Sequence, residues 1–495
     1  MNGDVKAEIV DDEISSEHLD VCPESNIASF RERHWVMSAM MGVDIISLQL
    51  SLYLGYLCRR MVDLWWPAQI STSHYQSLIV GMLLVPAGYW LMRLYPGYGL
   101  TQVERLRRRV RTTFVFLMLF ISWDFLVNHS GRSRGIFLFA FFFALIIPPI
   151  IQFIFQAMLI RMNCWGTPVV VLGAAHTGKH VVKSLLKDPT MGFRPVAVYD
   201  DDYNKVGKTL EGVPIIQGLL QANEVSGRIK YVLLAIPGAG KDLQVKLVHK
   251  LRFLHIIIIP DLIGMQSLWV EARDLSGMVG LQIQKNLLLR RSLYVKQFMD
   301  YFLGFPLFLL SIPILCFFAV WVMLASPGNP FYCQVREGRG GGKFKLWKLR
   351  TMYTEAENLL HKHLTANPEA KREWNQYFKL KDDPRILKGI GTILRKTSLD
   401  ELPQLWNVLR GEMSLVGPRP FPHYHLEEFS DEFRKLRRSV IPGMTGLWQV
   451  SARSDGDLAV QEMLDTYYIR NWSIWLDISL LARTILIVFS GKGAY

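Results

Sequence analysis

The sequence predicts a protein that combines membrane α-helices with α/β domains. We expect a bundle of four transmembrane helices, a doubly wound α/β domain, and a C-terminal α/β domain with a re-entrant membrane helix hairpin. Three observations predict this. Hydrophobic residues make up 50% of the 495 residues and lie in separate blocks. After the fourth block, strand-like runs alternate with helix-like stretches, which is typical of a parallel sheet. A fifth apolar block then stands between two basic flanks.

The net charge and the cysteines argue against several classes of protein. The charge is +13, which in a membrane protein favours contact with membrane lipids and phosphorylated substrates over nucleic acid. The five cysteines are scattered without a C-x-x-C pair, so we expect neither a zinc site nor a disulfide framework. Residues 1–34 are polar and acidic at their start, and we expect a disordered cytosolic tail rather than a signal peptide.

Residues 35–162 contain the four predicted transmembrane helices. Each apolar stretch is close to the roughly 20 residues that a helix needs to cross the hydrocarbon layer. The stretches are Trp35–Leu57, Ser77–Tyr95, Thr113–Val127 and Ile136–Ile160. The predicted loop between the second and third carries six arginines, whereas each outer loop carries two. The N-terminus and the chain after the fourth stretch are therefore expected in the cytoplasm.

Two carboxylates, Asp44 and Asp124, fall inside or near these spans. A carboxylate within a membrane is a functional hypothesis by default, because burying its charge is costly. It can instead hold the helices together. Both interpretations stay open for the two residues, with the bundle-stabilising role favoured.

Residues 163–290 predict a Rossmann-like domain. Its strands are expected at Pro168–Leu172, Pro195–Tyr199, Tyr231–Ile236 and His255–Ile259. The first leads into a turn with Gly173 and Gly178, and the second ends on Asp200, where a dinucleotide-binding fold carries its ribose-binding acid. Ala175 replaces the middle glycine, which normally lets the backbone approach a pyrophosphate. A nucleotide site and a scaffold or regulatory domain both stay open.

Residues 298–325 predict a re-entrant hairpin in the membrane. The segment is long enough to span, but Pro306 and Pro313 interrupt it and both flanks are basic. A helix that enters the membrane, breaks at Pro313 and returns would keep both flanks in the cytoplasm. The alternative is a fifth span that places the rest of the chain outside. The last apolar stretch, Asn471–Phe489, is expected to form an interfacial amphipathic helix.

Asp400 and Glu401 are adjacent carboxylates in a basic region. Pro403 lacks an N–H and is tolerated only in the first turn of a helix, so a helix is expected to start at Asp400 or Glu401. In one interpretation Asp400 is simply the helix N-cap. In the other, the helix start favours a phosphate beside the pair. One carboxylate would then attack phosphorus or hold Mg²⁺, while the other orients a group or relays protons.

Three basic motifs accompany this pair. Lys343–Arg350 alternates charged and apolar residues as a strand does, and an ordinary solvated edge strand explains it equally well. Pro418-Arg419-Pro420 holds an arginine between two rigid residues, which suits bidentate binding of a phosphate. The glycine-bearing stretch Pro442–Arg453 offers an aromatic side chain and a further arginine to a nucleotide, although a buried Trp448 is just as ordinary.

Taken together, the C-terminal motifs resemble those of the bacterial polyprenyl-phosphate hexose-1-phosphate transferases of the large monotopic type. The resemblance covers roughly residues 296–495, and the four-span region and the nucleotide-fold insert match in architecture. The motifs that carry it are Lys348–Met352, Phe378–Arg385, Lys396–Gln404, Gly411–Pro420 and Pro442–Ser451.

The resemblance implies an enzyme of surface polysaccharide assembly in the bacterial inner membrane, with the N-terminus and the catalytic domain, residues 291–495, facing the cytoplasm. It would transfer hexose-1-phosphate from a UDP-hexose to undecaprenyl phosphate and release UMP. Galactose is favoured as the hexose, with glucose next. A homodimer is a further expectation.

The resemblance also implies roles for individual residues. Asp400 would be the nucleophile, forming a phosphosugar-aspartate with Mg²⁺ nearby, and Glu401 would assist it. Pro313 would break the membrane helix. Phosphate and substrate contacts are expected from Lys345, Arg350, Arg385, Lys396, Pro418, Arg419, Pro420 and Arg453.

Two other functions stay open. One is a membrane-anchored NAD-dependent oxidoreductase or epimerase acting on sugar nucleotides, with its active site at Gly173. The altered glycine pattern and the lack of an evident Tyr-x-x-x-Lys pair near that fold count against it. The other is a non-enzymatic component of polysaccharide export, which would not need Asp400, Glu401 and Arg419.

Overall fold

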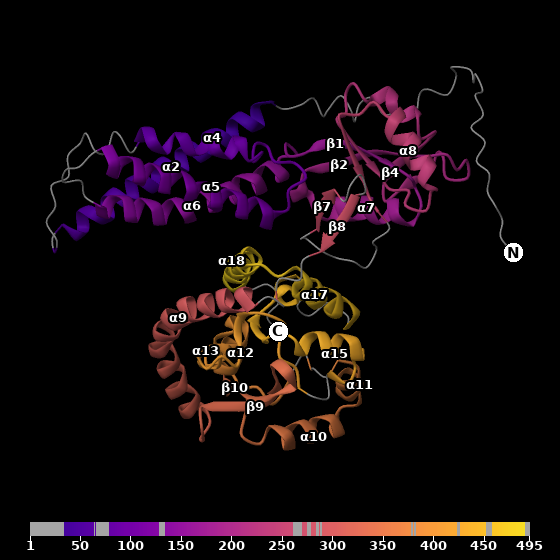
Figure 1. Cartoon of the computed structure of the whole chain (residues 1–495). Helices are drawn as coiled ribbons and strands as arrows, with labels where there is room; N and C mark the ends of the chain where they lie inside the picture. Colours follow the sequence, from indigo (N-terminus) through magenta and orange to yellow (C-terminus); the bar gives the residue numbers. More distant parts are fainter. Residues whose placement is uncertain are drawn as a thin grey trace. The chain divides into compact units, whose positions relative to one another are not determined.

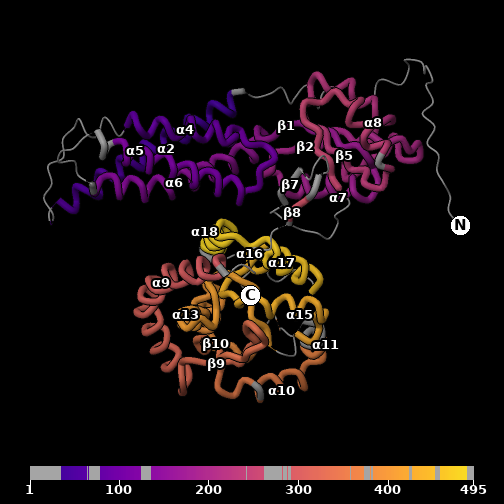
Figure 2. Tube along the Cα trace, viewed as in Figure 1, coloured from indigo at the N-terminus to yellow at the C-terminus, as the bar shows by residue number. Residues whose placement is uncertain are grey.

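The computed structural model describes residues 34–63, 65, 79–127, 134–260, 270–274, 279–283, 287, 290–377, 380, 383–422, 426–451 and 458–490. The chain divides into two compact units, Met1–Ile263 and Gly264–Tyr495, and each is described by itself. The first contains long helices and a six-stranded sheet, and the second contains mostly helices with short paired strands (Figures 1 and 2).

The helices of the first unit are α2 (His34–Val62), α4 (Leu84–Leu91), α5 (Gln102–Val127) and α6 (Arg134–Arg161). Of these, α2 and α6 are long and apolar enough to cross a membrane. They approach closely, because a Cβ on Gly55 would fall 2.6 Å from the backbone nitrogen of Ala140. The second expected span corresponds to a shorter apolar helix, Ile79–Leu91. The complete four-span bundle therefore stays a prediction.

The arginines expected in a loop before the third span are mostly helical. Only Arg93 precedes the helix, while the others, Arg105, Arg107, Arg108, Arg109 and Arg111, lie in α5. The hydroxyl of Thr101 accepts a hydrogen bond from the backbone N–H of Glu104 at 3.3 Å, and Glu104 pairs with Arg108 at 2.8 Å. Because this cap and these ion pairs support a helix, α5 starts well before the apolar stretch.

Asp44 lies at the centre of a buried polar network among these helices. Its carboxylate pairs with Arg109 and accepts hydrogen bonds from the Tyr95 hydroxyl at 2.6 Å and from Gln152 Nε2 at 3.1 Å. These partners come from three different segments of the helical region, so they support the bundle-stabilising role for Asp44. The side chain of Asp124 lies outside the described residues.

The sheet of the first unit is doubly wound, as predicted. Its strands are β1 (Thr167–Leu172), β2 (Phe193–Asp200), β3 (Thr209–Leu210), β4 (Val213–Gln217), β5 (Tyr231–Leu234) and β6 (His255–Ile258). They lie in the order β3-β4-β2-β1-β5-β6, parallel except for β3. Alternate residues of β1 pack on opposite faces: one set with α7 (His176–Lys187) and the other with α8 (Lys241–Lys250).

The turn after β1 reproduces two of the three glycine roles of a dinucleotide-binding fold. Gly173 has a φ of +103°, and a Cβ on Gly178 would fall 1.8 Å from the Gly173 carbonyl. The Asp200 carboxylate, expected near a ribose, accepts hydrogen bonds from the backbone N–H groups of Ala174 at 2.5 Å and Asp202 at 2.9 Å. Nucleotide binding here stays a hypothesis.

The second unit contains one long apolar helix, α9 (Arg290–Ala325), with Pro306 and Pro313 inside it. The expected division into two helices at Pro313 is therefore wrong for this structure: α9 is continuous, although it changes direction along its length (Figure 1). Each proline removes one backbone hydrogen bond and bends the helix without ending it. The re-entrant topology of 298–325 stays a prediction.

The rest of the second unit builds an α/β domain beside α9. An antiparallel pair joins β9 (Phe331–Glu337) to β10 (Lys343–Leu349), and a parallel pair joins β11 (Ser414–Val416) to β12 (Gly443–Thr445). A separate antiparallel pair is formed by β7 (Val270–Asp274) and β8 (Val279–Ile283). The helices are α10 (Ala356–Ala366), α11 (Pro368–Tyr377), α12 (Ile390–Thr397), α13 (Gln404–Leu409), α15 (Asp431–Arg438), α16 (Leu447–Ser451), α17 (Leu458–Asn471) and α18 (Ile474–Ser490).

A buried ion pair connects α9 to the C-terminal helices. Lys296 Nζ lies 2.7 Å from Asp477 Oδ2, with the two side chains 5% and 0% exposed. Tyr468 and Trp472 also donate hydrogen bonds to Asp477, at 2.8 and 2.9 Å. The helix expected at the C-terminus is present as α18, but the side chain of Asp477, its acidic residue, is buried inside the domain instead of facing solvent. An interfacial position for α18 stays a prediction.

We predict that Asp477→Asn destabilises the second unit strongly. The substitution leaves Lys296 buried without its counter-charge, which typically costs about 3–5 kcal/mol. Thermal unfolding of the detergent-solubilised protein measures the change. Asp431→Asn is the matched control, because its side chain is 81% exposed. Equal unfolding temperatures for Asp477→Asn and the wild type would show that the pair does not stabilise the fold.

Candidate active site

The two adjacent carboxylates lie in a single turn of 3₁₀-helix that precedes an α-helix. Asp400 and Glu401 belong to a 3₁₀ turn, Leu399–Glu401, between α12 and α13. The turn follows Ser398, whose φ of +56° ends α12, while α13 begins only at Gln404, after Pro403. A helical turn therefore begins at Leu399, one residue before the pair and close to the predicted start, whereas the α-helix itself begins later. The N-cap interpretation of Asp400 is wrong, because Ser398 is the residue that precedes the turn. The i→i+3 hydrogen bonds of the turn place the pair before the helix.

The two carboxylates have different partners. Glu401 Oε1 lies 2.8 Å from Lys348 Nζ and 2.7 Å from Arg419 Nη2, so two cations converge on one oxygen atom. Asp400 Oδ2 lies 3.8 Å from the same Lys348 nitrogen. Glu401 is therefore held in place by two charge-assisted hydrogen bonds, whereas Asp400 is held more loosely.

The pKa values of the two acids shift in opposite directions. Burial raises the pKa of Asp400 above its usual value; Lys348 opposes this effect, and the negative charge of Glu401 adds to it. Burial also acts to raise the pKa of Glu401, but the stronger combined effect of Arg419 and Lys348 holds it well below its usual range. Neighbouring acids whose environments differ in this way are suited to different chemical roles.

Lys348 comes from β10, and Asn407 of α13 holds that strand in place. The Asn407 side chain accepts a hydrogen bond from Trp347 N at 3.1 Å and donates one to Lys345 O at 2.8 Å. Asn407 is fully buried, so its amide replaces a missing strand neighbour for β10. Sequence reasoning chose Lys345 instead. Strand alternation is the signal that separates the two lysines, because residues three apart lie on opposite faces.

Arg419 is presented between two buried prolines, as the sequence predicts. Pro418 and Pro420 are buried, while the Arg419 side chain is 34% exposed. The preceding Gly417 packs against the second glycine-bearing motif, where a Cβ would fall 2.8 Å from Gly443 N. The close approach of these two loops therefore explains why glycine is needed at both positions.

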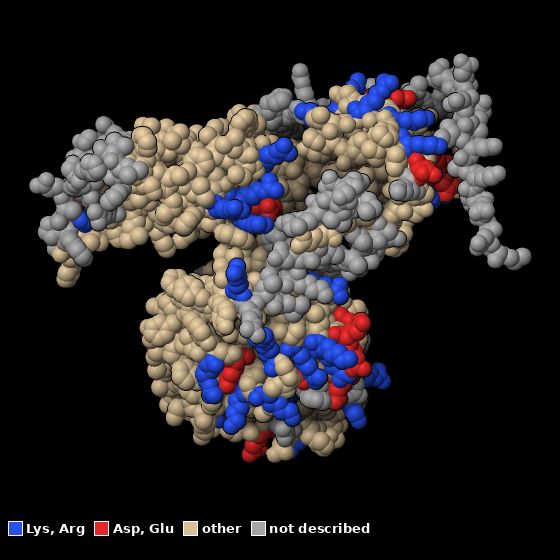
Figure 3. Space-filling model, in the orientation of Figure 1, with Lys and Arg blue, Asp and Glu red and all other residues tan. Residues whose placement is uncertain are grey.

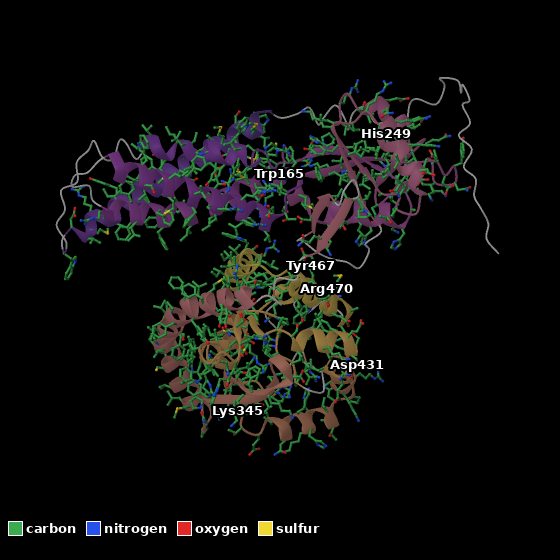
Figure 4. All side chains as sticks on the ribbon, in the orientation of Figure 1. Trp165, His249, Lys345, Asp431, Tyr467 and Arg470 are labelled. Carbon is green, nitrogen blue, oxygen red and sulfur yellow. The ribbon has the colours of Figure 1, made fainter. Side chains whose placement is uncertain are left out.

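The other residues expected at the site lie elsewhere or are engaged differently. The buried Arg350 guanidinium donates to the carbonyls of Ser326 and, at 3.2 Å, Pro327, just beyond the end of α9. Arg385 forms a bidentate pair with Asp383, with its shortest contact at 2.6 Å. Lys396 on α12 is exposed, and so is Lys345 on β10, which Figure 4 labels. Arg453 lies outside the described residues.

The site as a whole is basic. Lysine and arginine side chains gather on the face of the second unit that Figure 3 shows. Lys348 and Arg419 converge on the acid pair. The positive charge of Arg395 also acts on Asp400, where it opposes the rise in pKa that burial causes. Such a set of cations around a pair of partly buried acids suits a substrate that carries phosphate groups.

The donor set at the acid pair fits a magnesium ion only in part. Among the described residues there is no group of three or more His, Cys, Asp or Glu side chains that could hold a metal. Mg²⁺ is often bound through one or two carboxylates, with water and substrate phosphates completing its shell. Asp400 is the better ligand of the pair, because the Oε1 atom of Glu401 is already bound by two cations.

Comparison with known proteins agrees with this chemistry. Residues 291–491 match the bacterial sugar transferase family, and residues 97–260 match a CoA-binding domain family. A UDP-galactose-lipid carrier transferase of Erwinia amylovora is 32% identical over 82% of this chain and 86% of the relative. The undecaprenyl-phosphate galactose phosphotransferase of Salmonella typhimurium is 30% identical over 86% and 90%. A UDP-glucose:undecaprenyl-phosphate glucose-1-phosphate transferase of Escherichia coli is 32% identical over 66% and 68%.

These relatives match along most of their own length, so the likeness is not confined to one shared domain. The second unit, Gly264–Tyr495, contains the matched sugar transferase region together with the acid pair and its two cations, and is therefore the catalytic unit. The chain is therefore an enzyme of the bacterial sugar transferase family, and it belongs to the polyprenyl-phosphate hexose-1-phosphate transferases.

Proposed function

We propose that the enzyme transfers galactose-1-phosphate from UDP-galactose to undecaprenyl phosphate through a phosphosugar-aspartate on Asp400. The observation that carries this proposal is the difference between the two acids: Glu401 is bound by Lys348 and Arg419, and Asp400 is left available. Two of the relatives are named for galactose, which favours this hexose over glucose.

In the first step, a carboxylate oxygen of Asp400 attacks the phosphorus that carries the sugar. A new oxygen–phosphorus bond forms, the bond between the two phosphates of UDP-galactose breaks, and UMP leaves with the bond's electron pair. Burial raises the pKa of the Asp400 carboxyl group, and a more basic carboxylate would be a better nucleophile once it is ionised. Arg419 and Lys348 would stabilise the negative charge on the phosphate oxygens.

In the second step, an oxygen of undecaprenyl phosphate attacks the same phosphorus atom. Asp400 leaves as a carboxylate, and galactose is then linked to the lipid through a diphosphate. Glu401 would assist by keeping Lys348 and Arg419 in place while the phosphate groups exchange. When bound beside Asp400, Mg²⁺ would supply neutralisation of phosphate charge.

The proposal places the site at the cytoplasmic face of the inner membrane. There α9 would bring the lipid phosphate and the soluble nucleotide into one plane, with both of its ends in the cytoplasm. Its segment Arg291–Ala325 is strongly apolar, and only 17% of its most apolar stretch is buried inside the protein. The lipid-linked product would then be the starting point for assembly of a surface polysaccharide. We also expect the enzyme to form a homodimer.

The oxidoreductase alternative is not favoured. It would use the turn at Gly173, but the Asp200 carboxylate already accepts hydrogen bonds from Ala174 N in that turn and from Asp202 N just after β2. The export alternative leaves the arrangement of Lys348, Glu401 and Arg419 without a purpose, and the named relatives are transferases.

We predict that the enzyme exchanges labelled UMP into UDP-galactose when the lipid acceptor is absent. The exchange requires a covalent intermediate, because the sugar phosphate must wait on the protein for a new UMP. Asp400→Asn should lose both exchange and transfer by roughly 10⁴-fold or more. Asp431→Asn, an exposed acid on α15, should keep both. Substantial transfer by Asp400→Asn would exclude Asp400 as the nucleophile.

A second substitution tests the role of Glu401. Glu401→Gln keeps the shape of the side chain but removes the charge shared by Lys348 and Arg419, so both cations lose their fixed positions. We expect kcat to fall by roughly 100-fold, as when one preorganised charge-stabilising group is removed. Glu432→Gln on α15 is the exposed control. Unchanged kinetics for Glu401→Gln would show that this clamp is not needed.

A third experiment tests the proposed topology with the exposed Cys333 on β9 as a native reporter. The other four cysteines are replaced by serine. A membrane-impermeant thiol reagent should label Cys333 in inverted membrane vesicles and not in intact spheroplasts, while permeabilised spheroplasts should be labelled. Labelling from outside the intact spheroplast would instead show that α9 spans the membrane.

A further inference from the structure

A second arginine lies buried behind the Pro418-Arg419-Pro420 loop. Arg437 is in the last turn of α15, and its side chain is only 9% exposed. Its neighbour Arg438 is 43% exposed and pairs with Glu337 through two contacts, at 2.8 and 3.1 Å. The two adjacent arginines therefore have different surroundings, and of the two only the Arg437 side chain is buried.

The guanidinium of Arg437 connects two separate elements. Nη1 pairs with the carboxylate of Asp465 on α17, and Nη2 donates to the backbone carbonyl of Arg419. Figure 4 labels Asp431 at the start of α15 and Tyr467 and Arg470 on α17, the two helices that this arginine joins. Burying a guanidinium is costly unless it is paired, and here both of its ends are bound.

Two aromatic rings hold the same guanidinium from the side. Arg437 Cζ lies 4.7 Å from the ring centre of Phe421 and 5.6 Å from that of Phe433. Both rings are buried, and Phe421 directly follows Pro420. A planar guanidinium between an acid, a carbonyl and two rings has little freedom to move, which makes it suitable as a fixed support.

The carbonyl bound by Arg437 belongs to Arg419, the residue whose side chain reaches the acid pair. The peptide between Arg419 and Pro420 has no N–H group, so its carbonyl is the only backbone group there that a partner can hold. Fixing this carbonyl restricts rotation of the Arg419 backbone and thereby directs its side chain. Arg419 Nη2 then lies 2.7 Å from Glu401.

We propose that Arg437, oriented by Asp465, is a positioning residue that aims the Arg419 side chain at Glu401 and at the phosphate of the substrate. It acts through Arg419 and does not contact the substrate itself. This inference rests on the proposed function, in which Arg419 stabilises the phosphate during transfer. A purely structural role would make Arg437 a link between α15 and α17, independent of Arg419.

A double-mutant cycle between positions 437 and 419 distinguishes these roles. Arg437→Lys keeps the positive charge but cannot donate in fixed directions to both Asp465 and the Arg419 carbonyl. We expect kcat to fall by roughly 10- to 100-fold, because displacement by about 1 Å can cost that much. In the Arg419→Ala background, the same substitution should reduce kcat by less than about twofold, since its effect passes through the missing side chain.

Two further variants keep the test decisive. Arg438→Lys changes the adjacent, exposed arginine and should leave kcat unchanged. Asp465→Asn removes the carboxylate that orients Arg437, and its loss of kcat should also disappear in the Arg419→Ala background. If thermal unfolding shows that Arg437→Lys does not fold, the Asp465→Asn cycle decides the result.

Equal losses of kcat with and without the Arg419 side chain would overturn the positioning role, and so would an unchanged kcat in both Arg437→Lys and Asp465→Asn. Asp400→Asn is measured in the same series. Transfer by that variant would refute the proposed nucleophile, whereas equal losses in the cycle would refute only the role of Arg437.

Discussion

The buried pair between Lys296 and Asp477 determines how the apolar helix α9 is joined to the rest of the catalytic unit. Lys296 also donates to the carbonyl of Val416 at 2.9 Å, and Asp300, one turn later, accepts from Ser414 and Leu415. These contacts hold β11 directly before Gly417 and Arg419. The start of the apolar helix α9 and the loop that presents Arg419 therefore share one network of buried charges. Breaking such a network is costly, because each remaining charge has little water to solvate it.

The same arrangement explains how adjacent acids can serve different purposes. Lys348 reaches the pair from β10, and Arg419 reaches it from the loop after β11, so the two cations are held by separate parts of the fold. Both bind Glu401, which becomes their common counter-charge. Asp400 remains available in a site that is already positive. Asn407 supports one cation through β10 and Arg437 supports the other through its backbone, so residues outside the site determine its geometry.

Local patterns predicted the parts of the structure that depend on local chemistry. Four of the six strands of the Rossmann-like sheet follow from apolar runs and turns, and Asp400, Glu401 and Arg419, which their motifs singled out, lie together. Tertiary contacts decided the rest. Strand alternation places Lys345 and Lys348 on opposite faces of β10, but only tertiary contacts decide that the Lys348 face meets the acids. Pro313 would break an isolated helix, yet α9 bends through it. Arg350 was expected to bind phosphate, but its guanidinium binds carbonyl groups just beyond α9. A polar Asp477 in a terminal helix gave no sign that it pairs with Lys296.

The central claim is that Asp400 carries the sugar phosphate between the two substrates. Peptide mapping by mass spectrometry tests it most directly, on enzyme that is mixed with UDP-galactose without lipid acceptor and quenched rapidly. The account predicts a phosphohexose on the peptide that contains Asp400, which disappears when undecaprenyl phosphate is added before the quench. An unmodified Asp400 peptide in enzyme that has released a full equivalent of UMP, or a phosphohexose on another residue, would contradict it.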